Sequence, residues 1–364
     1  MCFIGGSAFE VAGFIADGGN YKVEVTINLK SEEVKKMKVF TKRISVLFIT
    51  LLVVLCFGFS AQGADKVRIA LGDVASVETL CFLVALDRAK DRGLDYEMTA
   101  FAKEQLAIQA VIGGQMDIGV GTPYSIIQKS KVPIRNFFQL SKLVFFPVAS
   151  NKYKTWQDLD GQPFTFHARG TGTEAIGDII IKREGITLGQ RSYVPGSENR
   201  IVGMMKGQIN ATIVDLSNKN ILMAKAGDKF HVLPGITDPA SDEVLFAEIG
   251  WIKENKESIA ILVEELLRTW REMTKDPSII EQERQKRNLL SDLPKELLVE
   301  VDAYYKEAVE GGLYDPNGGG VEAAKADFAF YVDAGQMNGP AADLKVEDYW
   351  YFVPLDAAKA KLGN

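Results

Sequence analysis

Short apolar runs alternate with longer segments of helical periodicity between residues 66 and 214. The short runs are rich in β-branched and aromatic side chains, as buried strands are. The longer segments repeat their apolar positions every three to four residues and end at glycine, as helices do. Strands are expected at 66–71, 96–101, 116–120, 164–166, 192–194 and 209–214, and helices at 77–92, 104–112, 173–184 and 199–206. This alternation predicts βαβ units and an α/β fold with mostly parallel sheets.

The predicted elements fall into two halves with the same order of strand, loop, helix, strand, helix and strand. The local sequence repeats as well, because GQMD at 114–117 returns as GQIN at 207–210. We interpret the halves as two similar lobes, each a mostly parallel sheet flanked by helices, with a cleft between them. Chance likeness between two ordinary βαβ units is the alternative interpretation.

Two further apolar runs, 143–149 and 244–251, flank the second half and are where the chain is expected to cross between lobes. The pattern beyond them is mainly helical, and we assign it to packing around the first lobe. We therefore predict lobe 1 from 65–148 and 249–364, and lobe 2 from 149–248. Helices are expected there at 252–275, 278–290, 294–311 and 321–335, with a short segment near 343–349.

The segment 37–64 has the layout of a secretory signal peptide. Lys38, Lys42 and Arg43 form a basic start, an apolar stretch follows over 44–59, and small residues close the segment. That stretch is short for a membrane span, which takes about 20 residues. We predict cleavage near residue 64, export to the periplasm, and a misassigned N-terminal extension over 1–36. An uncleaved membrane anchor is the alternative.

Charge and composition narrow the function. The formal net charge of −6 argues against a nucleic-acid partner, which calls for clustered Lys and Arg. Two histidines and three separated cysteines give no zinc spacing, no disulfide framework and little material for a catalytic triad. We therefore expect no metal site, no cofactor and no enzymatic activity.

Four predicted loops follow strand ends, where parallel α/β sheets bind their ligands. They lie at 72–76, 121–125, 167–173 and 215–218, two in each half. Facing one another across a cleft, these loops would hold one small molecule. The candidate ligand-binding residues are Asp73, Ser76, Thr122, Tyr124, His167, Arg169, Thr171, Gly172, Thr173, Asp215, Ser217 and Asn218.

The loop HARGTGTE at 167–174 carries the strongest signal. Its glycines allow close backbone approach, and Thr171 with Glu174 has capping-box spacing at a helix start. Free N–H groups there, with Arg169, favour an anionic ligand. The alternative is a well-capped loop whose arginine faces solvent.

Three other candidates have competing interpretations. Tyr124 would cover a ligand or pack in the core. Asp215 would bind a ligand amine, brace Arg169 or stabilise a turn. His167 would line the cleft, and its pairing with Asp215 is the acid–base pair that an enzyme on this fold would need.

These loops resemble the substrate-binding proteins of ABC importers in the NitT/TauT group, also described as SsuA/THI5-like or NMT1-like. The matching stretches are GGQMDIGVGTPYS at 113–125, DLDGQPF at 158–164, ARGTGTEA at 168–175, PGSENR at 195–200 and GQINATIVDLSN at 207–218. The resemblance implies a two-lobed type II periplasmic-binding fold that closes by hinge bending. It implies a monomer that delivers a small anionic or heteroaromatic solute to an ABC permease and its ATPase.

Two other protein classes remain as alternative assignments. The GTGTE stretch also resembles TAXI-type receptors of TRAP transporters, although the Gly-rich start of that group is missing. Enzymes of the THI5 type share the fold, but the Cys-rich motif that they use is absent from this sequence.

Overall fold

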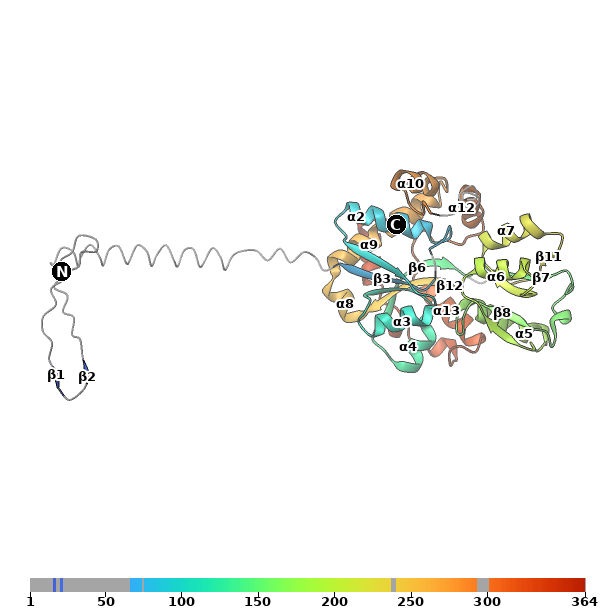
Figure 1. Cartoon of the computed structure of the whole chain (residues 1–364), viewed down its shortest axis with the longest axis horizontal. Helices are drawn as coiled ribbons and strands as arrows, with labels where there is room; N and C mark the ends of the chain where they lie inside the picture. The colour runs from blue at the N-terminus through green and yellow to red at the C-terminus, as the bar shows by residue number, and fades with distance from the viewer. Residues whose placement is uncertain are drawn as a thin grey trace. The chain divides into compact units, whose positions relative to one another are not determined.

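The computed structural model describes residues 66–73, 75–236, 240–292 and 301–363, together with 16–17 and 20–21. The chain divides into two compact units, Met1–Ala64 and Asp65–Asn364. In the first, β1 (Ala16–Asp17) pairs antiparallel with β2 (Asn20–Tyr21). The predicted extension and signal peptide otherwise lie outside the described residues. All that follows concerns the second unit (Figure 1).

One sheet of this unit has the strand order β4-β3-β5-β12-β6. Its strands are β3 (Val67–Leu71), β4 (Tyr96–Ala100), β5 (Ile118–Gly121), β6 (Ile134–Lys142) and β12 (Ser241–Glu248). The strands β4, β3 and β5 run parallel, whereas β12 runs antiparallel to both of its neighbours. We call this sheet and the helices on it lobe 1.

The other sheet has the order β11-β7-β10-β8-β9 and forms lobe 2. Its strands are β7 (Phe146–Ser150), β8 (Phe164–Phe166), β9 (Arg191–Tyr193), β10 (Ala211–Val214) and β11 (Phe230–Val232). Here β9, β8 and β10 are parallel and β7 is the antiparallel strand. Each five-stranded sheet thus has three adjacent parallel strands, then one antiparallel strand, then a fifth strand that pairs antiparallel with it. The prediction of two similar α/β lobes is confirmed.

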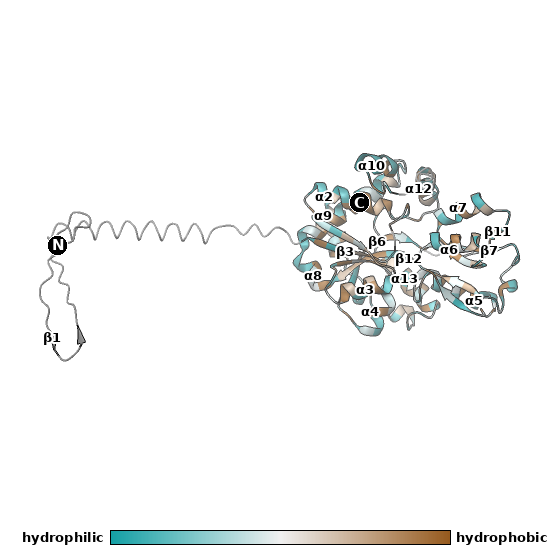
Figure 2. Ribbon diagram, in the orientation of Figure 1, coloured by the Kyte–Doolittle hydropathy of each residue, from teal (hydrophilic) through white to brown (hydrophobic). Residues whose placement is uncertain are grey.

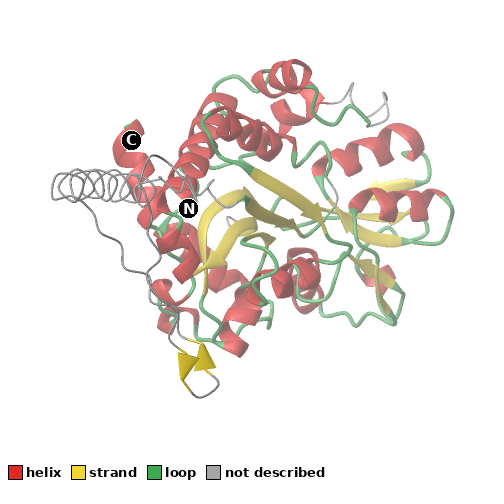
Figure 3. Cartoon of the chain, turned by 60° about the vertical axis from the view of Figure 1, so that its left-hand side comes forward, coloured by secondary structure: helices red, strands yellow, loops and turns green. Residues whose placement is uncertain are grey.

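Helices cover the outer faces of both sheets (Figure 3). They are α2 (Leu80–Asp91), α3 (Glu104–Ile112), α4 (Tyr124–Ser130), α5 (Gly172–Glu184), α6 (Ser197–Met205), α7 (Leu216–Ala226), α8 (Ile249–Glu254), α9 (Lys256–Met273), α10 (Ile279–Arg287), α12 (Val301–Glu310), α13 (Val321–Asp333) and α14 (Val353–Leu362). Short 3-10 turns lie at η1 (Gln157–Leu159), η2 (Ala341–Asp343) and η3 (Val346–Asp348). None of the helices in the described ranges has the length and apolar character needed to cross a membrane.

The core of lobe 1 shows why the C-terminal helices stay with this lobe. Along α9, Leu262, Leu266 and Trp270 recur at helical spacing and are buried, so one face of the helix packs inward. The Trp270 indole donates to the Leu140 carbonyl on β6 at 3.0 Å. The outward helix α10 is mostly hydrophilic (Figure 2).

The first crossing between the lobes falls within the predicted run of 143–149, whereas the return crossing comes before the predicted run of 244–251. The strand β6 ends at Lys142 in lobe 1 and β7 begins at Phe146 in lobe 2. The chain returns between β11 and β12, and β12 belongs to lobe 1 rather than to the predicted lobe 2 of 149–248. Its buried run is continuous because β12 pairs on both sides, with β5 and with β6.

Two of the C-terminal helices also reach lobe 2. Glu307 on α12 accepts from Lys219 Nζ at 2.9 Å and from Asn220 Nδ2 at 2.7 Å, both on α7. Asp333, at the end of α13, pairs with Lys182 on α5 at 2.6 Å. Polar contacts therefore join α12 and α13 to lobe 2, away from the crossing segments.

Candidate functional site

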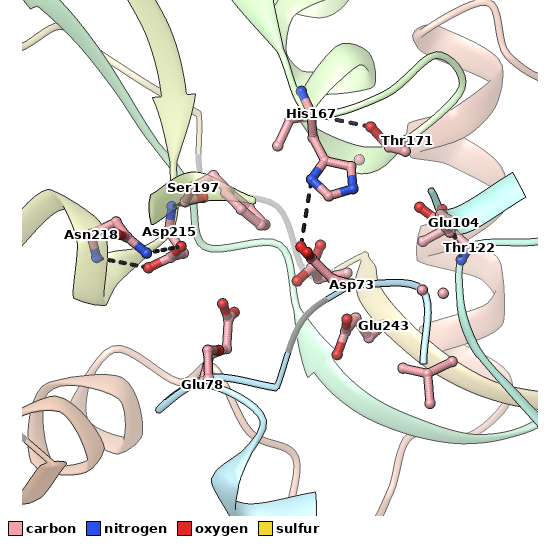
Figure 4. Close-up of a pocket in the computed structure, with 18 of the residues that line it drawn as sticks. Asp73, Glu78, Glu104, Thr122, His167, Thr171, Ser197, Asp215, Asn218 and Glu243 are labelled. Carbon is pink, nitrogen blue, oxygen red and sulfur yellow. Dashed lines mark hydrogen bonds and ion pairs between the residues drawn. The ribbon is translucent and has the colours of Figure 1, made fainter. Parts of the chain in front are cut away.

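A cleft of about 690 Å³ opens between the two lobes, at the strand ends named by the sequence (Figure 4). Both sheets contribute loops to it, and the segment that crosses after β6 contributes Phe145. The lining residues are Gly72, Asp73, Ser76, Glu78, Glu104, Val120, Gly121, Thr122, Phe145, His167, Thr171, Gly172, Thr173, Ser197, Glu198, Arg200, Asp215, Asn218, Asp242 and Glu243.

Most of the predicted site residues lie around this one space. The structure brings together Asp73, Ser76, Thr122, His167, Thr171, Gly172, Thr173, Asp215 and Asn218. Four segments that are far apart in the sequence thus converge, because the carboxyl ends of parallel strands meet at one edge of each sheet. Tyr124, Arg169 and Ser217 do not line the cleft.

Arg169 is exposed on the outer side of its loop. Its guanidinium lies over the Tyr193 ring, 5.0 Å from the centroid, and its carbonyl accepts from Gln105 of lobe 1. The side chain is committed to a cation–π contact outside the cleft. The prediction that Arg169 supplies an anion contact is therefore corrected, and with it the main reason for expecting an anionic solute.

Tyr124 and Ser217 are also placed away from the cleft. The Tyr124 ring is 1% exposed and stacks on Tyr331 with centroids 5.0 Å apart. Its hydroxyl donates to Asp327. Tyr124 is therefore a core residue of lobe 1, and Ser217 is buried on α7.

The loop before α5 is capped differently from the predicted capping box. Thr171 donates its hydroxyl to the Ala168 carbonyl at 2.8 Å and accepts no bond from the helix start. Glu174 accepts from the Gly170 N–H at 2.6 Å and from the Tyr193 hydroxyl at 2.5 Å. A carboxylate of the protein itself thus occupies a loop N–H group that was expected to meet an anionic ligand.

Sequence reasoning missed most of the acidic lining. Asp242 and Glu243 stand at the amino end of β12, next to the carboxyl end of β5, because Val244 pairs antiparallel with Gly121. A search confined to carboxyl ends of strands cannot find them. Glu78 precedes α2, Glu104 begins α3 and Glu198 lies in the first turn of α6.

These carboxyl groups raise one another's pKa. Burial and the neighbouring Asp73 and Glu104 raise the pKa of Glu243 to about 8. Burial, then Asp215 and other carboxylates, raises the pKa of Glu78 well above its ordinary value. The pKa of Asp242 is raised well above its usual range for the same reasons. Taking several carboxylates out of water side by side disfavours their charged forms.

Of the two basic residues of the cleft, Arg200 offsets part of this charge, because it interacts with Asp215, Asp73 and Glu198. The fully buried Arg200 donates to the Ile213 carbonyl at 3.0 Å, the Val194 carbonyl at 2.9 Å and the Ser197 hydroxyl at 2.7 Å. Its role is to join α6 to β10 and to the strand end after β9.

His167 lies at the centre of the cleft, with Nδ1 3.6 Å from an oxygen of Asp73 (Figure 4). That nitrogen accepts from the Gly196 N–H at 3.3 Å, so it carries no proton. Burial and the nearby Arg200 lower the pKa of His167 to about 3. His167 is therefore neutral, and its contact with Asp73 is not an ion pair. The predicted pairing of His167 with Asp215 has no hydrogen bond in the described structure.

Asp215 takes the turn-stabilising role among its three interpretations. It caps α7 by accepting from the Asn218 N–H at 2.8 Å, and its other oxygen accepts from Asn218 Nδ2 at 2.8 Å. The amide of Asn218 is thereby oriented, and its Oδ1 is buried with no partner in the described part of the chain. The segment 215–218 is the first turn of a helix rather than a loop.

Comparison with protein families gives a match to the family model described as NMT1/THI5 like, over residues 82–280. This chain belongs to the NMT1/THI5-like family. The matched segment of the NMT1/THI5-like chain runs from α2 to α10 and includes all of lobe 2. The resemblance noted in the sequence motifs is confirmed at the level of the family. A search of curated proteins found no match.

Solved structures share the fold at low sequence identity. A putative periplasmic sulfonate-binding protein SsuA from Methylobacillus flagellatus KT is 15% identical, with a TM-score of 0.57 over 82% of this chain and 95% of that one. The periplasmic nitrate-binding protein NrtA from Synechocystis PCC 6803 is 12% identical, with a TM-score of 0.60 over 82% and 89%. The ligand-binding component of an ABC-type import system from Staphylococcus aureus, with zinc bound, is 14% identical, with a TM-score of 0.60 over 80% and 98%. The NMT1/THI5-like chain thus has the two-lobed periplasmic-binding fold.

The chemical groups that line the cleft determine which ligands it can bind. It offers many hydrogen-bond acceptors, few available donors and a small apolar surface at Val120 and Phe145. No set of three or more His, Cys, Asp and Glu side chains within the described ranges is placed to hold a metal ion. The arrangement is suited to binding a small molecule that donates hydrogen bonds.

Proposed function

We propose that this protein is an exported solute-binding protein. It captures a small organic solute in the cleft, closes by hinge bending and delivers the solute to an ABC importer. The observation that carries the proposal is that both lobes line one cleft of about 690 Å³. Clefts between two lobes or domains are a common place for the sites of small organic molecules.

The connection between the lobes supports a hinge. The described chain passes between the two sheets at 143–145 and on the return from β11 to β12. Changes in backbone angles at two short segments can rotate one lobe against the other. The contacts of Glu307 and Asp333 with lobe 2 would form and break during this rotation.

The relatives support the partners. The sulfonate-binding, nitrate-binding and import-system proteins named above are described as transport or ligand-binding components. By analogy, we infer a periplasmic monomer that docks on an ABC permease with its ATPase. A TRAP-type receptor is the competing assignment, and neighbouring genes would decide it: an ATPase gene supports the ABC importer.

Capture without conversion is the part of the proposal that separates it from an enzyme on the same fold. His167 is the side chain on which acid–base chemistry would depend, and its pKa of about 3 makes it a poor base at neutral pH. Asp215 is engaged in capping α7. Neither residue is prepared for proton transfer in the described structure.

The direct test is to incubate the purified protein with a small-molecule extract, wash it, denature it and identify the released compound. The expected result is one compound bound near one per chain, recovered with unchanged mass, that raises the melting temperature on re-addition. A compound released with altered mass would favour the enzyme. If no compound is retained, the proposal of solute capture fails.

A further inference from the structure

We infer that the solute is an organic cation, whose protonated amine, amidine or guanidine group binds among the carboxylates of the cleft and Asn218. This inference rests on the proposed function and names the ligand class of the same site. It replaces the expectation of an anionic solute, which rested on Arg169.

The charge of the lining is strongly one-sided, and both lobes contribute to it. The carboxylates are Asp73, Glu78, Glu104, Asp242 and Glu243 from lobe 1, with Glu198 and Asp215 from lobe 2. Arg200 is the one positive charge among these lining residues, and its N–H groups donate to backbone carbonyls and Ser197, while His167 is neutral. A bound cation favours the charged forms of the carboxyl groups, whereas a bound anion would disfavour them, so the lining attracts a cation more than an anion.

Glu78 and Glu243 are the cleft carboxylates that lack hydrogen-bond and ion-pair partners among the described residues. Within the described structure neither side chain accepts a hydrogen bond or forms an ion pair, in contrast to Glu104, which accepts from the Thr122 hydroxyl at 2.7 Å. Both point into the space between the lobes (Figure 4). Both side chains are half-buried at the cleft, so a ligand that donates hydrogen bonds there would supply partners that the described protein groups do not.

Asn218 points to the same ligand independently of charge. The residue is 8% exposed and lines the cleft, and its Oδ1 has no partner among the described residues. The bond from Nδ2 to Asp215 fixes which end of the amide carries Oδ1, since the amide cannot turn without losing that bond. A neutral acceptor beside carboxylates requires an N–H or O–H donor, which an ammonium or guanidinium group supplies.

The mixed lining favours an organic cation over a bare metal ion. Val120 and Phe145 add apolar surface that a carbon skeleton would cover. A metal ion alone would leave this apolar surface uncovered.

Cation binding should be linked to proton release. The groups that face Glu243 across the cleft are Asp73, Glu78, Glu104, His167, Glu198, Arg200, Asp215 and Asp242. Carboxyl groups with raised pKa hold protons in the empty cleft, and a bound cation displaces them. For a ligand of fixed charge, the affinity should rise about tenfold per pH unit below the pKa of about 8. An affinity independent of pH between 6 and 8 would overturn the inference.

The ligand class can be tested before the ligand is known. Small molecules of yeast extract are separated at neutral pH into cationic, anionic and neutral fractions, and each is added to the purified protein. We expect the largest rise in melting temperature from the cationic fraction. A larger rise from either other fraction, or from Zn²⁺ or Ca²⁺ alone, overturns the cation inference but leaves solute capture intact. No rise from any of them counts against the proposed function itself.

Variants then locate the binding group. The double variant Glu78→Gln and Glu243→Gln should weaken binding of the compound purified from the cationic fraction at least about tenfold. The empty variant should melt no lower than the wild type, because the substitutions remove repulsion between buried carboxyls. Glu322→Gln, at an exposed site on α13, is the matched control and should bind normally. Unchanged affinity in the double variant, with the control intact, overturns the inference.

Discussion

At the scale of single residues, the cleft combines carboxyl groups that destabilise one another with basic groups that are structurally committed. Glu243 has its pKa raised from 4.5 to about 8, and His167 has its pKa lowered from 6.5 to about 3. The two shifts have opposite effects on stability. Their sum decides how the empty protein responds to pH.

Whether stability rises or falls with pH depends on which state, folded or unfolded, binds the proton more tightly. Glu243 stabilises the fold most below pH 4.5, and this contribution is lost as pH rises through about 8. His167 contributes stability above pH 6.5 that is lost as pH falls towards 3. Between pH 6.5 and 8 the carboxyl effect stands alone, so the stability of the empty protein should fall across that interval.

Glu243→Gln should reduce this fall, because an amide carries no charge to bury. We expect the melting temperature of the variant to exceed that of the wild type at pH 8 and to match it more closely at pH 5. Thermal unfolding of the empty wild type and variant at several pH values measures this difference in melting temperature. Exposed Glu322→Gln should follow the wild-type curve, and an unchanged slope in the cleft variant would contradict the assigned shift.

Arg200 allows a stability prediction. Its replacement by Met would leave the carbonyls of Val194 and Ile213 without their donor inside the protein. We expect the free energy of unfolding in urea to fall by about 2–4 kcal/mol. Arg169→Met, at the exposed arginine of the adjacent loop, should change it by no more than about 0.5 kcal/mol. Equal effects from the two variants would show that Arg200 is not structural.

Residue patterns were informative about where the cleft lies and less so about its chemistry. Glycine and strand-end signals predicted loops at Asp73, Thr122, His167 and Asp215, and these residues line the cleft of the described structure. Which side of a loop a side chain takes depends on tertiary neighbours, and Arg169 does not line the cleft. Its partner Tyr193 lies on a different strand, and no local signal connects them.

At the scale of elements, the antiparallel strand β12 explains why the predicted lobe boundary and the predicted lining differ from the structure. The run at 244–251 was recognised as strand-like, but its pairing between β5 and β6 joins segments about a hundred residues apart. Hydrophobic patterning cannot specify such a partner. Once β12 is in place, Asp242 and Glu243 face the cleft because the strand runs opposite to β5.

The contacts of α12 and α13 with lobe 2 lead to a further prediction. Glu307→Ala removes the acceptor shared by Lys219 and Asn220, which should shift the empty protein towards an open form. Exposed pairs of this kind contribute about 0–1 kcal/mol, so we expect a modest increase in the radius of gyration by X-ray scattering at low salt.

The salt dependence provides the check on that prediction. In about 0.5 M salt, screening should bring the wild type and Glu307→Ala to similar radii. Glu322→Ala breaks a pair confined to α13 and should have no effect on the radius at either salt concentration. If Glu307→Ala and the wild type match at low salt, α12 does not hold the lobes together.

At the scale of the whole molecule, two lobes of similar architecture form one cleft. Each lobe supplies only part of its lining. Strand and helix periodicity, with the GQMD and GQIN repeat, was sufficient to predict this architecture. The crossing segments were not predictable to the residue, because the apolar runs continue from one sheet into the next. Neighbours at 12–15% identity retain the fold, so the fold alone does not specify a solute.

The most direct measurement is a crystal structure of the protein with the compound recovered from the cationic fraction. The account predicts electron density in the cleft, with a nitrogen of the compound within about 3 Å of Asn218 Oδ1 and of the Glu78 or Glu243 carboxylate. Density for an acidic group against Arg169, or a ligand bound outside the cleft, would contradict it.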